Sequence, residues 1–163
     1  MDHVDKIIAQ WARERPDLDT GPMAIIGRMS RLVLEMSAEM QKTFRAHGLN
    51  AAGFDLLATL RRAGAPYRLS PGDLIASSMV TSGTMTNRID QLAKAGLVER
   101  IAQEGDRRSV LVGLTAEGLA RIEGMLEAHV ATQARLLAGL DAAERAQLDG
   151  LLRQMQAAQS PPA

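Results

Sequence analysis

Residues 85–95 carry polar side chains suited to contacting nucleic-acid bases, spaced to share one side of a helix. At about 100° per residue, Ile89 and Leu92 fall beside Met85 on an apolar side. The polar side is formed by Thr86, Asn87, Gln91 and Lys94. Asn and Gln amides bond adenine edges bidentately, and Thr contacts a thymine methyl or a phosphate. This pattern predicts a helix that enters the major groove of DNA, which admits one α-helix.

Groups suited to phosphate contact flank this helix. Ser82 and Thr84 lie where it begins, and hydroxyls beside free backbone N–H groups suit a phosphate. A polar loop over 103–108 follows between two β-type runs, and it predicts a hairpin with a charged tip. The charged residues at the end of this loop are Asp106, Arg107 and Arg108.

These side chains are positioned by predicted elements in a fixed order. Turn and cap residues separate helices expected over 50–62, 71–79 and 82–95 from a two-stranded hairpin over 97–114. That is the order of a winged helix-turn-helix. Asn50, Ser70, Thr115 and Asp141 are predicted N-caps. The remaining helices are expected over 3–14, 23–46, 116–140 and from Asp141 onward, so the fold class is mainly α.

Composition excludes several function classes. The 163 residues include no Cys, which removes disulfides, thiolate metal sites and thiol catalysis. His3, His47 and His129 have no metal-ligand spacing, and each is interpreted as a surface or interface side chain. No phosphate loop, nucleophile elbow or paired-histidine motif is present, so we expect no enzyme, metal or cofactor. No apolar run could span a membrane, and a cytoplasmic protein is expected.

The chain resembles the MarR family of bacterial transcription regulators. The motifs that carry the resemblance are FDLLATLRRAG, LSPGDLIASSMVTSGTMTNRIDQLAKAGLVER and GDRRSVLVGLTAEG. The resemblance implies a homodimer that binds a pseudo-palindromic operator in double-stranded DNA, most simply as a repressor. It also implies that Asp106 braces the wing loop while Arg108 enters the minor groove. The upstream half of the family's wing signature is missing, because Gln103 and Gly105 stand in its place.

The terminal segments carry more apolar residues than isolated end helices need, as the implied dimer requires. These residues are Ile7, Ile8, Leu136, Leu137, Leu140, Leu148, Leu151, Leu152 and Met155. We therefore assign dimerisation to 1–46 and 116–163, with a ligand contribution from 1–46, and DNA binding to 47–115.

The N-terminal helix narrows the resemblance to a urate-responsive subgroup of the family. The subgroup's ligand residues match Trp11, Asp55, Arg88 and Arg100. Arginine forks suit the oxygens of a planar anion, and an indole can pack on its ring. The residues alone leave other readings open: a surface acid for Asp55, a solvent or phosphate contact for Arg100, and a core or dimer anchor for Trp11.

The sequence leaves two alternatives to the interpretation as a urate-responsive regulator. The ligand of a MarR-type regulator can instead be a phenolic or other aromatic acid. A winged helix can also serve as a protein-interaction module without DNA binding, and that module would carry an apolar outer face on 82–95. The polar outer face in this sequence favours DNA.

Overall fold

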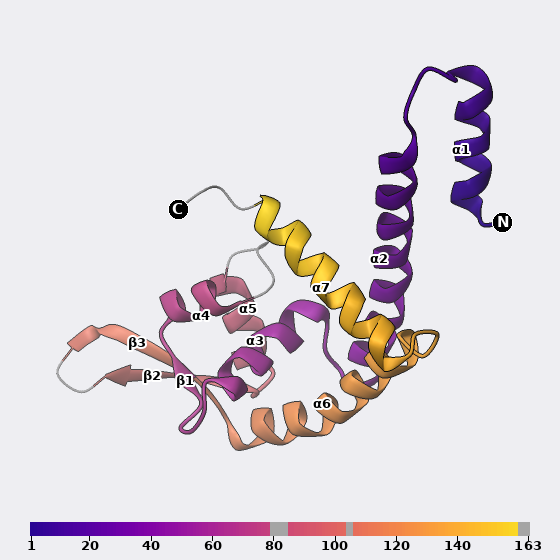
Figure 1. The fold of residues 1–163 in the computed structure, drawn as a ribbon. Helices are drawn as coiled ribbons and strands as arrows, with labels where there is room; N and C mark the ends of the chain where they lie inside the picture. Colours follow the sequence, from indigo (N-terminus) through magenta and orange to yellow (C-terminus); the bar gives the residue numbers. More distant parts are fainter. Residues whose placement is uncertain (79–84, 104–105, 160–163) are drawn as a thin grey trace.

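The computed structural model describes residues 1–78, 85–103 and 106–159, and this part of the chain forms seven helices and three strands (Figure 1). The elements in chain order are α1 (His3–Glu14), α2 (Gly21–Ala46), α3 (Ala51–Arg62), β1 (Arg68–Leu69), α4 (Pro71–Ser77), α5 (Met85–Lys94), β2 (Val98–Gln103), β3 (Asp106–Leu114), α6 (Ala116–Leu136) and α7 (Ala142–Gln159).

The predicted helix caps are confirmed as hydrogen bonds. Asn50 accepts the Gly53 N–H at 2.8 Å and begins α3, and Ser70 accepts the Asp73 N–H at 3.1 Å and begins α4. Asp141 accepts the Glu144 N–H at 2.9 Å ahead of α7. Each cap satisfies a backbone N–H that has no partner inside its helix.

The core surrounds α3. Leu56, Leu57 and Leu60 are at most 1% exposed. They lie in one apolar cluster with Leu74 of α4, Ile89 and Leu92 of α5, Val112 of β3, and Ile122 and Met125 of α6. This cluster positions α5 and the hairpin, so the winged helix-turn-helix order predicted from the sequence is the fold observed.

The sheet has three strands in the order β1-β3-β2, all antiparallel. The sequence predicted only the hairpin, here β2 and β3. The missed strand β1 is two residues long, with Arg68 opposite Gly113 and Leu69 opposite Val112. A strand this short has no periodicity of its own, and its pairing depends on the tertiary fold.

Among the described residues, three helix boundaries differ from the prediction by two residues or more. Helix α4 ends at Ser77 rather than at residue 79, and α2 begins at Gly21, two residues earlier than expected. Helix α6 ends at Leu136 instead of continuing to residue 140. The segment that follows contains Gly139, a residue that favours turns over helix interiors.

The terminal helices project from this core (Figure 1). Helix α1 lies along the first half of α2, where Val4 contacts Gly27 and the Arg28 guanidinium bonds both Asp2 and Asp5. Helix α7 has no buried residue. Among the described residues, no helix has the length and apolarity needed to cross a membrane.

Candidate nucleic-acid interface and ligand crevice

Helix α5 presents the polar side expected from its sequence. Ile89 and Leu92 are buried in the core, at 2% and 7% exposure. The exposed side chains on the other side include Thr86, Asn87, Gln91 and Lys94. The predicted residues Ser82 and Thr84 lie outside the described residues. The apolar face of α5 therefore packs on the core, and its other face exposes short polar side chains and the Lys94 cation to a binding partner.

The wing begins beside this helix. Its hairpin pairs Val98 with Leu114 and Arg100 with Val112, and its register shifts between Ala102 and Gln103. The charged residues Asp106, Arg107 and Arg108 stand at the start of β3, at the tip of the hairpin. Only their backbone belongs to the described structure, so the bracing role expected for Asp106 stays a prediction.

A junction at the base of the wing fixes it to α6. The Thr115 hydroxyl donates to the Gly96 carbonyl at 2.7 Å and accepts the Gly118 N–H at 2.9 Å. A Cβ at Gly118 would stand 1.8 Å from the Leu97 carbonyl oxygen, so only glycine fits this close approach. The sequence places Gly118 in the first turn of a helix, but it does not reveal the close approach of Leu97 that requires a glycine there.

Arg100 forms an ion pair that sequence reasoning missed. Its Nη1 lies 2.6 Å from Oδ1 of Asp90, which joins the first part of β2 to the exposed side of α5. Around α5, Asp90 is nearly opposite Arg88, since the two are separated by two residues at about 100° each. Within one chain, Arg88 and Arg100 therefore lie on different sides of α5.

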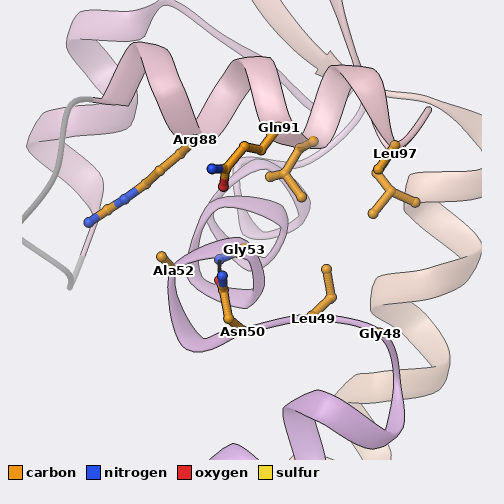
Figure 2. A pocket seen from close by; sticks show the side chains of 10 residues that line it. Gly48, Leu49, Asn50, Ala52, Gly53, Arg88, Gln91 and Leu97 are labelled. Atoms are coloured by element: carbon orange, nitrogen blue, oxygen red, sulfur yellow. Dashed lines mark hydrogen bonds between the residues drawn. The ribbon is translucent and has the colours of Figure 1, made fainter.

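A crevice of about 180 Å³ opens between α5 and the beginning of α3. Figure 2 shows the side chain of Gln91 directed from α5 toward Gly53 and Asn50, with Arg88 on the same side of α5. The described residues that line the crevice are Gly48, Leu49, Asn50, Ala52, Gly53, Arg88, Gln91, Leu92, Ala95 and Leu97. Gln91 thus faces the crevice as well as solvent, which the helical projection alone did not indicate.

The crevice combines a cation with the start of a helix. Arg88 supplies a forked guanidinium donor, and the amino end of α3 carries the positive end of a helix dipole. The two helices pack closely at Gly53, where a Cβ would be in ordinary van der Waals contact with Leu92 Cδ2 at 3.5 Å. An arrangement of this kind can hold a small anion.

The four predicted ligand residues are only partly assembled in one chain. Asp55 is buried at 7% exposure, so the reading of a surface acid is wrong. It lies one turn along α3 from Ala52, which lines the crevice, but Asp55 itself is not among the lining residues. Trp11 is 40% exposed on α1, which lies far from α5 in Figure 1. A core role for Trp11 within the single chain is therefore wrong.

The described residues hold no cluster of three or more His, Asp or Glu side chains suited to a metal ion. None of the described histidines lines the crevice. His129 on α6 stacks on Phe44 and Phe54, with ring centroids 5.6 and 4.4 Å away. Burial lowers the pKa of His129.

Comparisons with known proteins agree with this architecture. The MarR family model matches residues 49–110. The regulator PecS of Dickeya dadantii is 44% identical over 149 residues, covering 91% of this chain and 90% of PecS.

Two solved structures are similar in fold and sequence. BpsR of Bordetella bronchiseptica, whose DNA binding is regulated by 6-hydroxynicotinic acid, has a TM-score of 0.70 and 29% identity over 83% of this chain and 93% of its own. A cysteine-to-serine mutant of MarR from E. coli, complexed with operator DNA, has a TM-score of 0.69 and 25% identity over 89% of this chain and 96% of its own. The relatives are transcriptional regulators rather than enzymes, and the chain belongs to the MarR family of DNA-binding transcriptional regulators.

Proposed function

We propose that the chain is a cytoplasmic homodimeric repressor, released from a pseudo-palindromic operator by a small aromatic anion. The observation that carries the proposal is the two-sided character of α5. One side is buried in the core, and the exposed side presents Asn87 and Lys94 beside the wing. An interaction module that binds protein would need an apolar outer face there, so this polar face favours DNA.

The DNA contact divides between bases and backbone. Thr86 and Asn87 have side chains that suit contacts with base edges. Lys94 and the wing residues Arg107 and Arg108 have side chains that suit contacts with phosphates or the minor groove. Ser82, Thr84 and Gln91 complete the proposed set. MarR of E. coli, which is similar over most of the chain, is complexed with operator DNA.

Exposed apolar residues on the terminal helices support the proposal that two copies of the chain form a homodimer. On α2, Ile25, Ile26 and Val33 are 55–61% exposed. On α7, the exposed apolar residues are Leu148, Leu151, Leu152 and Met155. We assign dimerisation to 1–46 and 116–163 and DNA binding to 47–115. Two α5 helices in such a dimer would read half-sites about one helical turn apart.

The anion is assigned to the crevice between α3 and α5. Arg88 would bind its oxygens, and Asp55 of α3 would respond to its charge. A ligand wedged between these helices moves the helix that contacts DNA. Urate and phenolic or other aromatic acids share this chemistry, as does the 6-hydroxynicotinic acid that regulates BpsR. Trp11 lies on the projecting α1, so its contribution requires the second copy.

DNA binding is tested on a duplex that the protein selects from a random pool. We expect affinity to fall steeply with salt. Asn87→Ala should cost about 1–3 kcal/mol and change base preference, because an amide-to-base contact is lost. Gln10→Ala, an exposed amide on α1, is the matched control. Weak binding that does not respond to salt would contradict the proposal.

Ligand response is tested by adding urate, 6-hydroxynicotinate or salicylate to the complex and measuring DNA release. At least one should release the wild type while leaving Arg88→Gln bound. Arg45→Gln removes an exposed charge from α2 as the control, and it should respond like the wild type. Equal release of the Arg88 variant would move the ligand site away from the crevice.

A further inference from the structure

The ion pair between Asp90 and Arg100 occupies an unusual place for an acidic group. Asp90 lies one helical turn from Thr86 and one from Lys94, so it belongs to the side of α5 assigned to DNA. Its side chain is 52% exposed and that of Arg100 is 44% exposed, so both charged groups are within reach of a bound polyanion. The pair also links the recognition helix to the wing at 2.6 Å.

The charges of this pair have opposite effects on DNA binding. An unpaired carboxylate at this position would repel phosphates, while an unpaired arginine would attract them irrespective of base sequence. Arginine is suited to forked bonds with either a carboxylate or a phosphate, so Asp90 competes with DNA for the same donors. The paired groups together carry no net charge.

We propose that Asp90 is a specificity-determining residue that withholds Arg100 from the DNA backbone. The inference rests on the proposed DNA-binding function. By holding Arg100, Asp90 removes a phosphate contact that would strengthen binding to every sequence equally. Because that contact is withheld, the bases that Asn87 reads decide a larger share of the affinity. The ion pair also fixes β2 against α5.

The experiment measures binding to selected and unrelated duplexes over a range of salt. Asp90→Asn should bind unrelated DNA more tightly and reduce the ratio of selected to unrelated affinity. Each arginine freed onto a phosphate adds about 0.9 to the slope of log affinity against log salt, and a dimer frees two, so the slope should steepen by about 1.8. A fourfold rise in salt would then cost this variant about tenfold more affinity than the wild type.

Three further variants separate the roles of the two charges. Arg100→Gln should weaken binding to all DNA, because Asp90 is left facing phosphates. The double variant Asp90→Asn, Arg100→Gln should return toward the wild-type slope, because a neutral pair replaces a neutral pair. Asp90→Glu keeps the carboxylate and should keep the wild-type slope. Thermal unfolding of each variant verifies that the fold is retained.

Asp17→Asn is the matched control. It also removes a carboxylate that is paired with an arginine, at 2.7 Å from Arg15, in the connection between α1 and α2. Its slope should equal that of the wild type. If Asp90→Asn behaves like this control, or weakens all binding as Arg100→Gln does, the inference is overturned while DNA binding stands. If the wild type itself shows no salt-dependent binding, the proposed function and this inference fall together.

Discussion

The winged-helix unit and the projecting terminal helices use the same apolar residue types in opposite ways. In the unit, Leu57 and Leu74 are 0% exposed. On α7, Leu148, Leu151 and Leu152 follow an equally regular helical spacing, yet they are 39%, 52% and 40% exposed. Both regions have amphipathic helices, and only the first buries them within one chain.

Apolar periodicity in a helix therefore predicts a buried face without predicting which chain buries it. Contiguous exposed apolar surface on a soluble domain marks an interaction site. The same holds for α2, where Ile25 and Val33 are exposed while the opposite side receives α1 through Gly27. The compact unit and the terminal helices should therefore respond differently to truncation of their leucines.

The largest effect is expected from a cavity in the unit. Leu57→Ala should lower the free energy of unfolding by about 2–5 kcal/mol, because a fully buried leucine is removed. Leu151→Ala should cost at most about 0.5 kcal/mol in dilute protein, where its side chain is a surface residue. Urea unfolding monitored by circular dichroism measures both.

The two leucine variants should also differ in how their stability depends on protein concentration. A second copy stabilises the folded chain by mass action. The cost of Leu151→Ala should therefore grow as concentration rises, while that of Leu57→Ala should not. A cost for Leu151→Ala that is large and independent of concentration would mean that α7 packs on its own chain.

A smaller effect is expected where α1 joins α2. Val4 is the buried residue of α1, at 5% exposure, and it packs on Gly27. Val4→Ala removes the equivalent of two methylene groups, worth about 1.5 kcal/mol. Hydrogen exchange should then accelerate in α1 and stay unchanged in α3. Lys6→Ala, at an exposed position of the same helix, is the control, and equal acceleration there would show that Val4 is not the anchor.

Features set by neighbouring residues were predictable from the sequence. The caps at Asn50, Ser70 and Thr115 each bond a backbone N–H three residues away, so their signal is local. Gly48, two residues beyond the end of α2, has a φ of +70°, the left-handed conformation that glycine adopts readily and that its residue type indicates. The polar face of α5 also followed from spacing alone, since the core contacts only one side of that helix.

Features set by distant residues were not predictable. Asp55 resembles a surface acid in its own helix, and it is buried because α3 is surrounded by the rest of the unit. The partner of Arg100 depends on how β2 lies against α5, which no spacing within either element specifies. Trp11 and Arg88 were expected to share a site, and the single chain holds them on separate regions because α1 packs on the projecting part of α2.

The smallest effect is expected at His129, where the unit meets the terminal helices. Its ring stacks on Phe44 and Phe54, and its Nδ1 is buried without a hydrogen-bond partner among the described residues. Burial lowers its pKa, because the imidazolium loses hydration there.

The unfolded chain therefore binds the proton on His129 more readily than the folded chain does. The contribution of this group to stability is full above the unfolded pKa of about 6.5 and declines as pH falls below it. Urea unfolding as a function of pH should show this loss, and His129→Phe should remove it while keeping the stacking. An unchanged pH dependence in that variant would assign the loss to other groups.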